Sequence, residues 1–135
     1  MQMALLSKLF QTISRFLPDP GLSEKEVEML SNLNPEKFYA ENVRHILGIS
    51  HASAVRICET AVRQGLFERR VEVMCPDGAV ASSADTEAHL PPTVRCWHQE
   101  GGFLEQEELQ TETLEKAVFY RLHEQSDSSP YRQTA

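Results

Sequence analysis

The sequence has no long apolar run and few cysteines, and each shortage excludes a class of protein. No stretch approaches the ~20 consecutive apolar residues that a membrane-spanning helix requires, so we expect no membrane span. Three cysteines are an odd number that does not suit a secreted disulfide framework, which makes a reducing cytoplasm the expected location. The apolar run near the N-terminus contains Lys8 and precedes no Ala-x-Ala site, so it lacks the pattern of a secretory signal peptide.

Positive charge is also scarce. The 135 residues carry 13 Lys and Arg against 20 Asp and Glu, and the net charge of −7 argues against bulk-charge binding to nucleic acid or anionic lipid. The shortage is uneven, because residues 43–72 carry five Arg and three Glu whereas residues 73–135 carry eleven acids and four bases. A small basic surface in the middle of the chain therefore remains available for DNA, although acidic neighbours within a Debye length of ~8–10 Å would repel it.

The chain lacks the short motifs of catalysis. It contains no Gly-rich phosphate loop, no His-Glu-x-x-His and no nucleophile elbow. His51 follows Ser50 at an expected helix start, which is not the setting of a catalytic pair. The acids between Glu105 and Glu115 are crowded on one segment and indicate a solvated or partner-facing patch. We therefore expect no enzymatic activity and no catalytic residue.

Residues 1–18 have the pattern of an amphipathic helix that ends at Pro18. Its apolar stripe has three interpretations: it packs on the protein's own core, docks a partner or a second copy, or binds a membrane surface. Only Lys8 and Arg15 supply positive charge around it, so we expect no membrane partner. The candidate partner-binding side chains of this stripe are Leu5, Leu9, Phe10, Ile13 and Phe16.

Two further helix starts follow the Pro- and Gly-containing break. Ser23 and Glu26 match a capping box, in which the hydroxyl accepts from a backbone N–H and the carboxylate reaches back to the cap. Asn34 and Pro35 suit the N-cap and first turn of another helix, which is expected to open there. The sequence thus predicts several short helices before its centre.

The centre of the chain has the pattern of a winged helix-turn-helix. Gly48 is suited to end one helix in the left-handed conformation, and Ser50 to cap the next, which is expected over about 51–64. An apolar/polar alternation over 67–74 then predicts a strand. The run VRHILGISHASAVRICETAVRQGLFERRVEV resembles the helix-turn-helix and first wing strand of bacterial winged-helix proteins of the ArsR/MarR type.

That resemblance implies that the helix at about 51–64 is a recognition helix lying in the DNA major groove. Arg56 is then suited to pair with guanine, while the serines and the remaining arginines contact phosphate. The alternative is that the same side chains form a solvated or protein-contacting face. The candidate DNA-binding residues are Arg44, Ser50, His51, Ser53, Arg56, Thr60, Arg63, Arg69 and Arg70.

The segment after the predicted strand resembles a zinc ribbon that has lost half of its cysteines. A ribbon needs two Cys-x-x-Cys knuckles for tetrahedral zinc, and here Cys75 and Cys96 each stand alone. We expect a ribbon that folds on its apolar residues and holds no cofactor. The alternatives are zinc held by Cys75, Cys96 and His98, or a Cys75–Cys96 disulfide.

Two features of the ribbon-like segment have more than one interpretation. Trp97 either packs against the core, which we favour, or is an exposed anchor for a partner. Residues 111–123 fit a closing strand, but their apolar residues also keep helical spacing.

These patterns together predict an α+β protein with helices first and a small antiparallel ribbon-like β module last. The expected divisions are an N-terminal helix at 1–18, a winged helix-turn-helix at 22–74, the ribbon at 75–124 and a loose tail at 125–135. We expect a non-enzymatic, cytoplasmic DNA-binding transcription regulator that forms a homodimer through its N-terminal helix. The alternative is a protein-interaction adaptor, an accessory subunit that docks on a larger partner through the winged helix, N-terminal helix and acidic ribbon.

Overall fold

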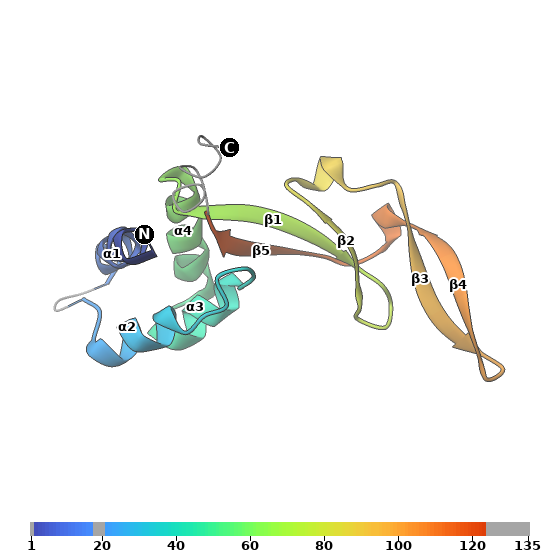
Figure 1. Ribbon diagram of the computed structural model, residues 1–135, viewed down its shortest axis with the longest axis horizontal. Helices are drawn as coiled ribbons and strands as arrows, with labels where there is room; N and C mark the ends of the chain where they lie inside the picture. The colour runs from blue at the N-terminus through green and yellow to red at the C-terminus, as the bar shows by residue number, and fades with distance from the viewer. Residues whose placement is uncertain (1, 18–20, 124–135) are drawn as a thin grey trace, which may run out of the picture. The chain divides into compact units, whose positions relative to one another are not determined.

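The computed structural model of the protein describes residues 2–17 and 21–123, and within them the chain has an α+β fold with the helices first (Figure 1). This confirms the predicted fold class. Four α-helices are followed by five strands and two 3₁₀ turns in the described residues. The helices are α1 (Gln2–Ser14), α2 (Glu24–Ser31), α3 (Ala40–Leu47) and α4 (His51–Arg63). The strands are β1 (Phe67–Met74), β2 (Val80–Ala84), β3 (Thr93–Glu100), β4 (Phe103–Gln110) and β5 (Lys116–Leu122), with η1 (Glu87–His89) and η2 (Thr111–Thr113) between them.

Local side-chain chemistry explains where the helices begin and end. At the start of α2, Ser23 Oγ accepts from the backbone N–H of Glu26, and Glu26 Oε1 accepts from that of Ser23, which is the predicted capping box. Gly48 ends α3 with φ +65°, a left-handed conformation that favours glycine. Ser50 caps α4, since its Oγ accepts from the backbone N–H of Ser53 at 3.1 Å.

The prediction that a helix opens at Asn34 and Pro35 is wrong. Asn34 Oδ1 accepts from the backbone N–H of Glu36 at 3.0 Å, which stabilises a turn instead of a helix. Phe38 is extended and exchanges two backbone hydrogen bonds with Tyr120, at 2.9 and 2.7 Å. Because a partner 82 positions away occupies the Phe38 backbone, α3 begins only at Ala40.

The strands form two sheets, one with the order β2-β1-β5 and one made of β3 and β4. Residues 111–123, for which helix and strand were both predicted, contain the strand β5. The chain divides into two compact units: one runs to Glu68 and resumes at Tyr120, and the other is Arg69–Phe119. This division differs from the expected boundary after residue 74. Because β5 pairs with β1, the segment that carries β2, β3 and β4 is an insertion between two paired strands.

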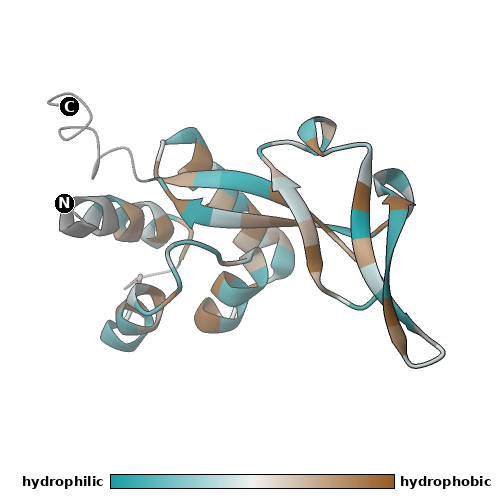
Figure 2. Cartoon of the chain, turned by 45° about the vertical axis from the view of Figure 1, so that its right-hand side comes forward, coloured by the Kyte–Doolittle hydropathy of each residue, from teal (hydrophilic) through white to brown (hydrophobic). Residues whose placement is uncertain are grey.

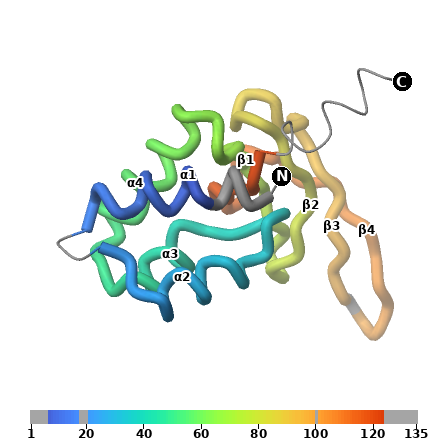
Figure 3. Tube along the Cα trace, turned by 60° about the vertical axis from the view of Figure 1, so that its left-hand side comes forward, coloured from blue at the N-terminus to red at the C-terminus, as the bar shows by residue number. Residues whose placement is uncertain are grey.

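The core of the helical unit joins all its elements. Phe38, Phe67 and Tyr120 pack together, with the Phe38 and Phe67 ring centroids 4.8 Å apart. The Tyr120 hydroxyl donates to Glu59 of α4 at 2.7 Å, so the end of β5 is tied to the centre of that helix. Helix α1 packs against α4, as Figure 3 shows.

The second unit is built around a smaller core, in which the strands β1, β2 and β3 and the loops between them supply the buried residues Val71, Val73, Cys75, Ala84, Leu90, Val94 and Cys96. Cys75 and Cys96 form a disulfide with a Cα–Cα distance of 5.6 Å, so these two candidate zinc ligands are bonded to each other. In the described residues, no group of three His, Cys, Asp or Glu side chains is arranged to hold a metal ion.

None of the described helices is long and apolar enough to cross a membrane.

We expect Cys58 to be unreactive toward dithiobis(nitrobenzoic acid) at mildly alkaline pH while the protein is folded. Its side chain is fully buried on α4, and burial, assisted by the nearby charge of Glu59, raises the pKa of the thiol to about 12. Thiol counting checks this together with the disulfide. In denaturant the chain should show one reactive thiol without reductant and three after reduction. A rapid reaction of the folded protein, or three thiols without reductant, would contradict the structure.

Candidate functional site

The exposed face of α4 brings four of the candidate DNA-binding residues together. Ser53, Arg56, Thr60 and Arg63 follow one another at spacings of three or four, so they form one stripe along the helix. Arg56 and Arg63 are exposed. The Arg63 guanidinium donates to Thr60 Oγ1 at 3.1 Å. Arg56 has no hydrogen-bond or ion-pair partner within the described chain, which leaves its guanidinium available to a ligand.

An acidic side chain lies at the N-terminal end of this stripe. Glu41 of α3 accepts from Arg44 Nε at 3.0 Å and lies 3.1 Å from His51 Nδ1. The hydrogen bonds from Arg44 and then His51 lower the pKa of the Glu41 carboxyl, which therefore stays ionised at neutral pH. Two candidate phosphate contacts are thus engaged with a carboxylate, an arrangement that the sequence reasoning missed. Glu41 precedes Arg44 by three positions on a helix, and that spacing was the available signal.

The remaining candidate DNA-binding residues have other positions. Ser50 is the cap of α4, and its hydroxyl also bonds to Ser53 Oγ at 3.0 Å. Arg69 and Arg70 lie on β1 in the second compact unit. The Arg70 guanidinium reaches Ser83 of β2 at 3.5 Å.

The N-terminal apolar stripe packs on the protein's own core, so its assignment as a partner-binding surface needs correction. Leu9 is 5% exposed and Ile13 is 1% exposed, and both belong to the main core of the helical unit. Phe10 and Phe16 are half-buried against that core. The side chain of Leu5 lies outside the described residues. Side chains that are buried in the core of their own chain cannot also form a dimer interface.

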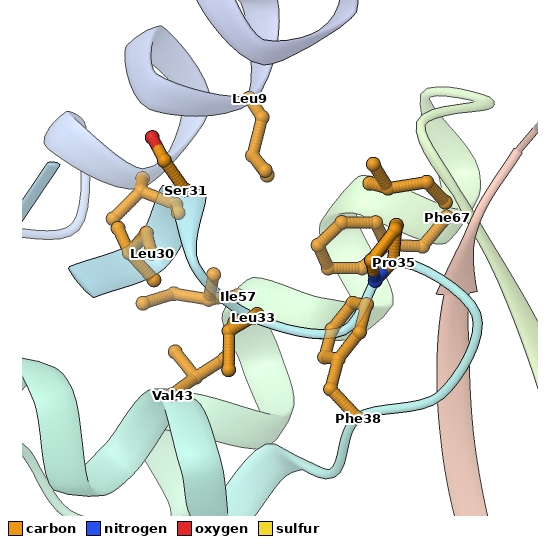
Figure 4. A pocket seen from close by; sticks show the side chains of 11 residues that line it. Leu9, Leu30, Ser31, Leu33, Pro35, Phe38, Val43, Ile57 and Phe67 are labelled. Carbon is orange, nitrogen blue, oxygen red and sulfur yellow. The ribbon is translucent and has the colours of Figure 1, made fainter. Parts of the chain in front are cut away.

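The helical unit contains a small apolar cavity of about 90 Å³. Figure 4 shows Leu9, Ile57 and Phe38 approaching it from α1, α4 and the loop before α3. Its volume is well below the roughly 300 Å³ at which ordinary small-molecule sites begin. The lining contains no titratable side chain, so it offers no group for acid–base chemistry.

The second unit exposes large apolar side chains near the end of the β3–β4 hairpin. Trp97 is 55% exposed, Phe103 73% and Leu104 67%. The expectation that Trp97 packs against the core is therefore wrong. Side chains alternate along a strand, and Val94 and Cys96 face the core of this unit, so Trp97 points to the opposite side. Figure 2 shows hydrophobic positions among hydrophilic ones on this hairpin.

Comparison of the chain with protein-family profiles, with curated proteins and with solved structures finds no match.

Proposed function

We propose that the protein is a small, non-enzymatic DNA-binding regulator of the winged-helix type, in which α4 enters the major groove. The observation that carries this proposal is the exposed stripe on α4, which follows the short Gly48–Ser50 turn after α3 and has Arg56 unengaged at its centre. A guanidinium in this position can donate to both acceptors of a guanine edge. Thr60 and Arg63 on the same stripe are suited to phosphate contacts.

Glu41 limits the positive charge that α4 presents. Its carboxylate holds Arg44 and His51, so phosphate contact by those two side chains would first have to replace the Glu41 bonds. These ion pairs are exposed and therefore weak, so DNA phosphates can compete for them. This arrangement favours modest affinity for random DNA.

We expect the purified protein to bind random duplex DNA with micromolar affinity at low salt, and Arg56→Ala/Arg63→Ala to weaken that binding about tenfold or more. Fluorescence anisotropy over a salt series measures both quantities. Because Arg63 is assigned to phosphate and Arg56 to a base edge, the slope of log K against log salt should fall by about 1 in magnitude. Glu41→Gln should tighten binding, because it releases Arg44 and His51.

The matched control is Arg15→Ala/Lys25→Ala, which removes two exposed positive charges, one just after α1 and one on α2. It lowers the total charge equally, so an equal loss of affinity would show a nonspecific charge effect. Absence of binding at low salt, or wild-type binding by the α4 double variant, would refute the proposal. The proposed role also implies a cytoplasmic protein, in which reductants would act on the Cys75–Cys96 bond.

A second candidate function is that of a protein-interaction adaptor, favoured by the surface of the second unit. Residues 69–119 carry ten acidic and four basic side chains, a net charge of −6. A surface of this sign repels DNA, while exposed tryptophan, phenylalanine and leucine side chains are typical of protein contacts.

A further inference from the structure

The β3–β4 hairpin has one face that packs on the core of its unit and one that faces solvent. Val94 pairs with Leu109 and Cys96 with Glu107, so these side chains share the first face, whose base is buried. Trp97 lies on the opposite face, where the diagonal pairing of the strands makes Leu104 its neighbour. The disulfide to Cys75 anchors the middle of β3 and so limits the movement of the apolar side chains nearer the tip of the hairpin.

A groove of about 510 Å³ lies between this hairpin and the turn after β1. Its lining includes Pro76 and Asp77 of the turn, Glu107 and Leu109 on the core-facing side of the hairpin, and Trp97 and Leu104 on the opposite side. Apolar walls with carboxylates among them suit a side chain that has an aliphatic stem and a positive end.

The charge around the groove has one dominant sign. Glu105 and Glu107 flank His98, with the carboxylate of Glu107 3.4 Å and that of Glu105 3.9 Å from its ring nitrogens. Both glutamates remain at least half exposed, so they can meet a second positive group. With a net charge of −6, this unit repels a second copy of itself, nucleic acid and anionic lipid.

The backbone of the hairpin supplies a second means of recognition. Among the described strands β4 pairs only with β3, so its outer edge presents unpaired N–H and C=O groups. Seven of its eight residues are exposed, so no side-chain packing covers the strand. An extended segment can add to such an edge through main-chain hydrogen bonds and place alternate side chains in a neighbouring groove.

We propose that the groove and the outer edge of β4 bind an extended, basic segment of a partner protein. An arginine or lysine of that segment lies in the groove, with its stem against Leu109 and its charge near Asp77 and Glu107. Phe103 and Leu104 supply apolar contacts to the neighbouring residues of the segment. This inference rests on the second candidate function, the protein-interaction adaptor, and specifies the kind of segment that the adaptor binds.

Trp97 is the single tryptophan of the chain, so its fluorescence reports directly on this site. The probe is a ten-residue peptide of alternating arginine and valine with blocked ends, titrated into the full-length protein. We expect saturable change in Trp97 emission at low salt, weakened as salt rises. A peptide with glutamate in place of arginine should give no change.

Two double variants test the carboxylates and the apolar side chains of the site separately. Asp77→Asn/Glu107→Gln should weaken peptide binding about tenfold, since two partly exposed charge contacts are lost. The matched control, Glu87→Gln/Glu112→Gln, removes two exposed carboxylates outside the groove and should bind as the wild type does. Phe103→Ser/Leu104→Ser changes two exposed side chains, so it should fold normally while also losing about tenfold in affinity.

The proposal is overturned if Trp97 emission does not change at millimolar peptide, or if the glutamate peptide changes it equally. It is also overturned if the groove variant and its control bind the peptide with equal affinity, or if phosphatidylcholine vesicles cause the same change in emission. A mass that doubles with concentration, and reverts in the Phe103→Ser/Leu104→Ser variant, would overturn it in favour of self-association. The Arg56→Ala/Arg63→Ala variant should bind the peptide normally. A failure of DNA binding is therefore distinguishable from a failure at this groove, and peptide binding without DNA binding would leave the adaptor as the supported function.

Discussion

Replacing Ile13 by Asp is expected to unfold the helical unit. Ile13 is 1% exposed and packs in the main core, where α1 meets α4. Removing a buried isoleucine side chain costs about 2–5 kcal/mol, and placing a carboxylate in an apolar site adds several more. The sum of at least ~5 kcal/mol is comparable with the whole stability of an ordinary domain. The variant should therefore show little helical signal and no cooperative thermal transition.

Circular dichroism during heating and urea titration measures this effect. Gln11→Asp is the matched control, because it introduces the same side chain two positions away on α1 at an exposed site. It should change the free energy of unfolding by less than about 0.5 kcal/mol. A folded Ile13→Asp protein with altered mass by light scattering would instead show that α1 serves a subunit interface, as one interpretation of the sequence held.

Removing the Cys75–Cys96 disulfide is expected to lower the stability of the second unit by about 3 kcal/mol. The bond closes a loop whose ends are 21 positions apart, and opening it restores conformational freedom to the unfolded chain. This loss should be a large fraction of the free energy of unfolding of the second unit, because the unit has only a small apolar core and part of it is a two-stranded hairpin. Cys75→Ala/Cys96→Ala should therefore unfold the ribbon well before the helical unit.

Hydrogen exchange of the β3 and β4 amides, with and without reductant, follows the ribbon separately from the helices. Reductant should accelerate exchange in the wild-type hairpin and have no effect on the double variant, which serves as the control for the reagent. Wild-type exchange rates that do not respond to reductant would contradict the disulfide or its stabilising role. Peptide binding, followed by Trp97 emission, should also be lost in this variant, because the disulfide would no longer anchor β3.

Much of the local structure around the candidate site follows from short sequence signals. The Ser23 capping box, the left-handed Gly48 and the Ser50 cap are confirmed because each depends on residues within a few positions along the chain. The prediction of a helix start at Asn34 fails because the structure there depends on a residue far along the chain. Its sequence suits a cap, but the backbone at Phe38 pairs with a strand 82 positions later, and tertiary pairing overrides local preference.

The surfaces were harder to predict than the elements. The stripe of Ser53, Arg56 and Thr60 is evident from helical periodicity. The hydrogen-bond partners along α4 are not, because Glu41 contacts His51 at the start of the helix and does not contact Arg56. The partner of a long side chain depends on distances in the folded protein, and the spacing of residues along the sequence does not give those distances. The sequence likewise left α1 with a choice between core and partner, since an apolar stripe has the same pattern in both cases.

The sequence by itself determined the fold class, the order of helices before strands, the helix caps around Gly48 and the acidic character of the second half. These are properties of composition and of neighbours along the chain. Only the tertiary structure decided that Cys75 and Cys96 are bonded, that β5 returns to β1, and that Trp97 faces outward. Each of these depends on which distant segments meet, and burial and strand pairing are settled by the free energy of the whole fold rather than by local preference.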